Sequence, residues 1–175
     1  MKIFGGYFSR VILAAALLAM TIGGALASAA DDYPAQRISA QQRCPVCGMY
    51  PARYPAWAVQ VIFKNRSMIS LESPMELFRF LADVKKYDAQ HTAADIAKIY
   101  VTDYAQKNWI DAKQALYVQG SKVKGPMGAG LPAFADKAAA EALAKEAGGS
   151  VTTFDALAAA GHADHGGHEH GHSRR

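Results

Sequence analysis

Apolar residues recur along the chain in two rhythms, which predict strands and helices in a regular order. The segments 57–63 (WAVQVIF) and 67–71 (SMISL) are rich in β-forming residues and predict two strands joined by a tight turn at 64–66. A helix is predicted to begin at Ser73, because Ser73-Pro74-Met75-Glu76 has the pattern of a capping box with proline in the first turn. Its core-facing residues recur at helical spacing and are Leu77, Phe78, Leu81 and Val84.

The same order of elements returns in the second part of the chain. Strands are predicted at 97–104 and 116–118, with a short, partly extended segment at 131–134. A helix over 137–147 is capped by Asp136 and ended by two glycines, and a strand over 150–154 follows. Strands followed by a helix, twice over, indicate an α+β fold in two similar halves.

The first residues read as a targeting segment. Lys2 and Arg10 precede an apolar run that continues to Ile22. Ala27-Ser28-Ala29 then has the small residues that are typical of a signal-peptide cleavage site. We therefore expect a cleavable signal peptide over 1–29, export of the chain, and a flexible leader over 30–43. No cysteine lies at the cleavage site, so no lipid anchor is evident.

Composition and charge narrow the function classes. The formal net charge of +4 falls by two without the signal segment, and no basic stripe is interleaved with aromatic residues, which argues against nucleic acid as a partner.

The folded domain is expected over 44–160. From Gly161 to Arg175 the chain becomes a His-rich, low-complexity tail that is expected to be disordered. Five histidines there are accessory candidates for binding copper or other metals: His162, His165, His168, His170 and His172.

The chemistry of the chain is concentrated in Cys44-Pro45-Val46-Cys47-Gly48-Met49, which holds both cysteines. Thiolate and thioether donors together favour soft ions, above all Cu(I). A structural zinc site would need a second pair of ligands, and outside the tail the only histidine is His91. A thioredoxin-like redox pair would need a helix directly after the motif, which Pro51 and Pro55 oppose. A plain disulfide would close only a very small loop and stabilise little.

A remote methionine could complete a Cu(I) site. Met68 and Met75 fall in a predicted strand and helix, where methionine usually fills the core. Met127 lies in Gly125-Pro126-Met127-Gly128, a turn-rich segment with no apolar periodicity, so its side chain is harder to explain by packing.

With these motifs in place, the chain resembles the NosL family, the accessory proteins of nitrous oxide reductase. The resemblance covers about 43–157. Its motifs, in order, are CPVCGM at 44–49, VTDY at 101–104, WIDAKQALYV at 109–118, GPMG at 125–128, AFA at 133–135 and GGSVTTF at 148–154.

The resemblance implies two ββαβ-type halves and a periplasmic Cu(I) chaperone for the copper-sulfide centre of nitrous oxide reductase in denitrification. The family's Cu(I) ligands fall on Cys47 and Met127, Met49 matches the motif methionine, and Cys44 matches a position that the family fills variably. The implied partners are apo nitrous oxide reductase and its membrane assembly machinery, and no enzymatic turnover is implied. Members are commonly lipoproteins, whereas this chain shows no lipobox cysteine, and the His-rich tail lies outside the shared pattern.

Two other function classes stay open at this point. The chain could be a general periplasmic metal buffer in which the His-rich tail does most of the binding. It could also be a thiol-disulfide protein that uses Cys44 and Cys47.

Overall fold

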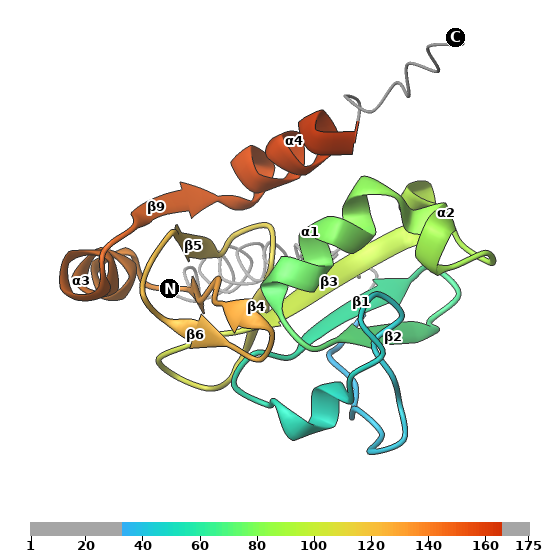
Figure 1. The fold of residues 1–175 in the computed structure, drawn as a ribbon. Coiled ribbons are helices and arrows are strands. Elements are labelled where there is room, and N and C mark those ends of the chain that lie inside the picture. Colours follow the sequence, from blue (N-terminus) through green and yellow to red (C-terminus); the bar gives the residue numbers. More distant parts are fainter. Residues whose placement is uncertain (1–32, 166–175) are drawn as a thin grey trace, which may run out of the picture. The chain divides into compact units, whose positions relative to one another are not determined.

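A computed structural model describes residues 33–165, and the predicted signal peptide lies outside them. The first half of the fold is a four-stranded antiparallel sheet in the order β2-β1-β3-β4. Its elements in chain order are the 3-10 turn η1 (Pro51–Arg53), β1 (Val59–Phe63), β2 (Met68–Leu71), α1 (Pro74–Ala82), α2 (Val84–Tyr87), the 3-10 turn η2 (Ala93–Asp95), β3 (Ile96–Thr102) and β4 (Trp109–Asp111) (Figure 1).

The second half is a three-stranded antiparallel sheet in the order β8-β5-β9, with a small hairpin inserted before β8. Its elements are β5 (Leu116–Gln119), the hairpin strands β6 (Lys124–Gly125) and β7 (Gly128–Ala129), β8 (Ala133–Phe134), α3 (Lys137–Ala147), β9 (Ser150–Thr153) and α4 (Phe154–His165). None of the helices in the described part of the chain has both the length and the apolar character that a membrane crossing needs.

The two halves share one topology. In each, the first strand lies in the centre of its sheet, the second strand pairs with one edge of it, and the strand after the helix pairs with the other edge. This gives β1, β2, α1, β3 in the first half and β5, β8, α3, β9 in the second. The structure therefore confirms the α+β fold with two ββαβ-type halves.

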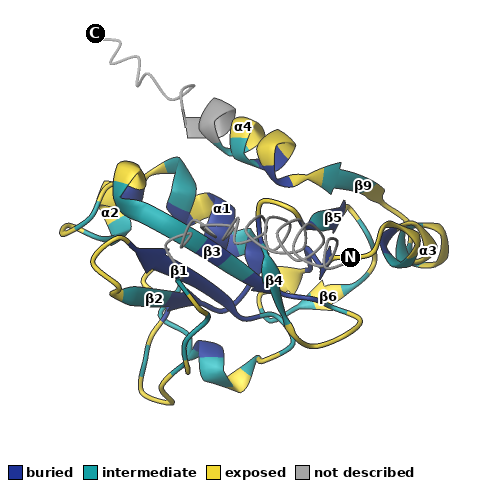
Figure 2. Cartoon of the chain, turned by 180° about the vertical axis from the view of Figure 1, so that it is seen from behind, coloured by how far each residue is buried: buried dark blue, intermediate teal, exposed yellow. Residues whose placement is uncertain are grey.

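The main hydrophobic core lies around β1 and α1 and is closed by the C-terminal helix. Every residue of β1 is buried (Figure 2). Helix α4 packs on α1, where Phe78 meets Phe154 with ring centroids 5.3 Å apart. Phe78 also meets the edge of Tyr117 at 5.5 Å, and the buried Tyr117 hydroxyl donates a hydrogen bond of 2.7 Å to the carbonyl of Ala112. These contacts join the two halves into one core.

The segment before the cysteines has no regular secondary structure over 33–39, but it is held to the first sheet. The side chain of Gln60, fully buried in β1, exchanges hydrogen bonds of 2.7 and 2.6 Å with the backbone of Gln36. The Tyr100 hydroxyl donates to the carbonyl of Tyr33 at 3.0 Å. This part of the leader thus supplies the polar partners that a buried glutamine requires.

Three sequence predictions need correction in detail. The Ser73 side chain makes no capping hydrogen bond, although Pro74 does begin α1 as predicted. The helix does not continue through Val84, because the backbone angles of Asp83 (φ −150°, ψ 80°) are not helical. Asp83 instead caps α2 by accepting from the Lys86 amide. The strand predicted to end at 104 ends at Thr102, since Asp103 turns the chain by accepting from the amides that follow it.

Candidate metal centre

The two cysteines lie on a tight turn directly before the first half of the fold. The Cys44 amide donates to the carbonyl of Met49 and the Gly48 amide donates to the carbonyl of Cys44, both at 2.8 Å. Gly48 has a φ of +76°, which glycine adopts without strain and other residues rarely adopt. The turn therefore needs its glycine and brings both sulfurs to the same side of the loop. Cys44 is buried in the main core, and Cys47 is half-buried beside it.

Glu72 is the third member of the cluster. It follows β2 directly, and no part of it is exposed to solvent. Its Oε2 atom accepts from the Cys47 thiol at 3.4 Å and lies 3.8 Å from the Cys44 sulfur. The ligand atoms of these three residues all lie within 4.8 Å of one another, close enough to bind one metal ion.

The Ser73 hydroxyl, which the sequence assigned to helix capping, donates to Oε1 of Glu72 at 3.2 Å instead. The capping-box partner Glu76 is also fully buried, and its carboxylate pairs with Arg79 at 2.8 Å. None of the ion pairs found among residues 33–165 involves Glu72. A carboxylate with hydrogen bonds but no cation is thus placed directly against the two thiols.

Burial disfavours the charged forms of Cys47 and Glu72. It raises the pKa of the Cys47 thiol far above its ordinary value; the Met49 backbone opposes this, while the neighbouring Cys44 and Glu72 raise the pKa further. Burial also raises the pKa of Glu72, and the like charge of Glu76 adds to that effect. The Cys47 thiol is therefore favoured in its protonated form when no cation is bound, and a metal ion that binds its sulfur replaces that proton.

The predicted ligand set also includes two methionines. Met49 is half-buried and follows the glycine of the turn. Met127 is at the tip of the β6–β7 hairpin, next to Gly128 with a φ of +111°, and is 55% exposed. Among residues 33–161 it is the only large apolar side chain that is exposed. The ligand roles of Met49 and Met127 stay predictions.

The hairpin that carries Met127 is anchored in the same core as the cysteines. The Gly130 amide donates to the carbonyl of Val123 at 2.9 Å, and a Cβ atom added at Gly130 would lie 2.8 Å from the Trp57 ring. Leu131 belongs to the same buried cluster as Cys44. The base of the hairpin is thus fixed, while its tip reaches solvent.

The histidines take no part in this centre within the described residues. His91 stacks on Phe63 with ring centroids 3.8 Å apart, and its Nδ1 atom lies 2.7 Å from the Asp88 carboxylate. Helix α4 runs to His165 and so past the predicted start of the tail at Gly161. The side chains of His162 and His165, and all of His168, His170 and His172, lie outside what the structure describes.

Three comparisons place this arrangement among known proteins. The model of the NosL family matches residues 34–161. The copper-binding lipoprotein NosL of Stutzerimonas stutzeri is 34% identical over 141 residues, which cover 73% of this chain and 70% of that protein. The crystal structure of the copper chaperone NosL from Shewanella denitrificans superposes with a TM-score of 0.61 at 28% identity, covering 71% of this chain and 95% of that one.

Proposed function

The chain belongs to the NosL family, and from this premise we propose that it is an exported, Cu(I)-binding copper chaperone. It would carry copper to the assembly of the copper-sulfide centre of nitrous oxide reductase and would act in the periplasm, without catalysing a reaction. One observation carries the proposal: two free thiols and a buried carboxylate lie within 4.8 Å of one another in a member of this family.

Cys47 is the proposed thiolate ligand. It is the more exposed of the two cysteines, because Cys44 is only 1% exposed and packs in the core. When Cu(I) binds, the Cys47 thiol releases its proton and the sulfur bonds to the ion. The thioethers of Met127 and Met49 are the proposed neutral donors, and such soft ligands suit Cu(I).

The charge of Glu72 supports one thiolate rather than two. If Cu(I) replaces one proton on Cys47, the total charge beside the Glu72 carboxylate is unchanged. If Cu(I) replaces protons on both cysteines, the site gains a negative charge 3.4 to 3.8 Å from that carboxylate, which is unfavourable in a buried position. A site of one thiolate and one or two thioethers also has few ligands, so a donor of the acceptor protein can bind the ion before the chaperone releases it.

The Cys47 environment argues against a thiol-disulfide enzyme. Such enzymes use a cysteine whose pKa is lowered, so that the reactive thiolate is present at neutral pH. Here burial and the neighbouring carboxylate raise the pKa of Cys47. The structure thus offers a thiol that is kept protonated until a metal ion arrives.

Competition with a Cu(I)-specific chelator tests the proposal. Cys47→Ser should abolish tight binding and Met127→Leu should weaken it. Met75→Leu is the matched control, because Met75 packs against the core and should leave affinity unchanged. A chain ended after His165, where α4 ends, should keep its high-affinity site. If Cys47→Ser binds Cu(I) like the parent, or if the shortened chain loses the site, a buffer that uses the tail is the better explanation.

A further inference from the structure

Two exposed arginines lie beside the cysteine turn. Arg43 donates to the carbonyl of Gly48 at 3.1 Å and to the Tyr50 hydroxyl at 2.6 Å. Its guanidinium carbon lies 4.5 Å from the centroid of the Tyr50 ring, and that of Arg53 lies 4.7 Å from the same centroid. One tyrosine ring thus holds two like charges beside the metal-binding turn, and their mutual repulsion would be relieved by an anion.

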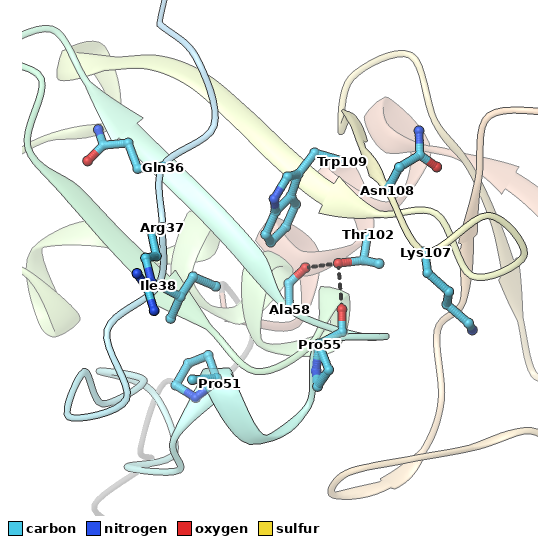
Figure 3. A pocket seen from close by; sticks show the side chains of 11 residues that line it. Gln36, Arg37, Ile38, Pro51, Pro55, Ala58, Thr102, Lys107, Asn108 and Trp109 are labelled. Atoms are coloured by element: carbon cyan, nitrogen blue, oxygen red, sulfur yellow. Dashed lines mark hydrogen bonds between the residues drawn. The ribbon is translucent and has the colours of Figure 1, made fainter.

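A pocket of about 300 Å³ continues this surface. Its apolar lining includes Pro51, Pro55 and the ring of Trp109, and it is reached from the same 3-10 turn that carries Arg53. In Figure 3 the Trp109 ring lies between the side chains of Arg37 and Lys107. Thr102 also lines the pocket, and its hydroxyl is hydrogen-bonded to the carbonyls of two other lining residues, Pro55 at 3.0 Å and Ala58 at 2.9 Å. The pocket is therefore a formed hollow with cations at its edge.

Within residues 33–161, no acidic side chain forms an ion pair with these cations. The stretch 33–71 contains no aspartate or glutamate. Beyond it, Asp103 is buried and accepts from backbone amides, and Asp111 pairs with Lys98. The ion pairs of residues 33–165 include none of the four exposed cations, which we call the basic rim: Arg37, Arg43, Arg53 and Lys107.

We propose that the basic rim and the Trp109 pocket form the docking surface for the copper acceptor, and that the acceptor presents an acidic patch with an apolar side chain at its centre. This inference rests on the proposed chaperone function and names the chemistry of its partner. The carboxylates of that patch bind the guanidinium groups, and the apolar side chain enters the pocket against Trp109. Docking there brings the acceptor close to Cys47, because Arg43 of the basic rim donates a hydrogen bond to the Gly48 carbonyl of the cysteine turn.

A protein partner fits these observations better than a lipid surface. Arg43 is held by the Tyr50 ring and by hydrogen bonds, and Arg53 lies over the same ring. A planar guanidinium in a fixed position suits a carboxylate. A membrane-binding face would carry several exposed apolar side chains for insertion, and residues 33–161 have only Met127. Complementary charge would speed the encounter and set its orientation.

Copper transfer to apo nitrous oxide reductase provides the first test. The rim variant Arg37→Glu/Arg53→Glu/Lys107→Glu spares Arg43 and the turn. The control variant Lys85→Glu/Lys122→Glu/Lys145→Glu makes the same change in net charge at exposed lysines elsewhere. Both should bind Cu(I) with the affinity of the parent. At low ionic strength the rim variant should transfer copper about tenfold more slowly or worse, and its rate should lose its dependence on salt, whereas the control should change little. Equal rates for the two variants would overturn the inference.

A second test does not depend on the acceptor. A short peptide of aspartate and glutamate around one leucine is titrated into the copper-free chain, and amide shifts are followed by NMR. Shifts should gather at the rim and at the Trp109 indole, and the amide analogue of the peptide should not produce them. If shifts scatter over the surface, or if the parent binds vesicles containing phosphatidylglycerol through the rim while the peptide does not bind, the docking surface is wrong. If the peptide maps to the rim but the parent transfers no copper to the reductase, the proposed acceptor is wrong and the docking surface stands.

Discussion

Replacing Glu72 by glutamine distinguishes two ways in which the sulfurs could hold Cu(I). Glutamine keeps the size of the side chain and removes its charge. The carboxylate oxygen lies 3.4 Å from the Cys47 sulfur and 3.8 Å from the Cys44 sulfur. With an effective dielectric constant of about 20, two unit charges at such distances interact by about 4 kcal/mol.

The expected effect follows from counting protons. With Cys47 as the one thiolate, Cu(I) takes the place of one proton, so Glu72→Gln should change the dissociation constant by less than about tenfold. With Cys44 and Cys47 both as thiolates, two protons leave for one ion. The variant should then bind Cu(I) more tightly by about 4 kcal/mol, close to a thousandfold. Our proposal predicts the first result.

Chelator competition at pH 7 under reducing conditions measures this difference. Glu76→Gln is the matched control, because Glu76 is an equally buried carboxylate four residues away that pairs with Arg79 instead of contacting a thiol. A thousandfold gain in Glu72→Gln alone would make Cys44 the second thiolate ligand. A loss of similar size would make the carboxylate itself a ligand of the ion. Either result would refute the argument for a single thiolate.

The same variant and a pair of glycine variants test stability. The pKa of Glu72 is raised in the folded state, so the stability that its proton contributes is complete below the ordinary value of 4.5 and is lost as pH rises through the raised pKa. Urea unfolding should therefore show Glu72→Gln gaining on the parent from pH 4 to pH 8, and a constant difference would contradict this. Gly148→Ala should cost about 1 to 3 kcal/mol, because its φ of 75° and ψ of 179° lie in a region that is essentially restricted to glycine. Gly149→Ala should cost about 2 kcal/mol more, because its Cβ would lie 2.4 Å from the carbonyl oxygen of Gln119; equal losses would show that β9 can move away from β5.

The sequence predicted those parts of the fold in which local pattern and packing agree. The strands β1, β2 and β5 and the helix α3 lie close to their predicted ranges, because their apolar spacing also marks the buried face. The strands β4, β6 and β7 were missed, since two or three residues carry no periodicity and their pairing depends on neighbours distant in sequence. Helix α4 was missed because its alanine-rich sequence has only a weak apolar face. Its position in the fold depends on packing against α1, which is distant in sequence.

The candidate site was predicted only in part for a related reason. The CPVCGM motif pointed to Cys44 and Cys47 because both lie within four residues of each other. Glu72 gave no such signal, since it lies 25 positions after Cys47 and only the fold brings its carboxylate within 3.4 Å of that thiol. In the sequence its neighbour Ser73 resembled a helix cap, and only the fold shows that the Ser73 hydroxyl orients the Glu72 carboxylate instead.

The matching order of strands in the two sheets has a consequence for how this protein could have arisen. A duplicated ββαβ unit leaves such a pattern, with equivalent strands at equivalent places. The cysteine turn precedes the first copy, and the Met127 hairpin interrupts the second between β5 and β8, where the first copy has only the short turn between β1 and β2. The segments that carry the predicted ligands Cys47, Met49 and Met127 therefore stand outside the repeated framework. Each can lengthen, shorten or exchange its donor without altering the strand pairing on which both halves depend.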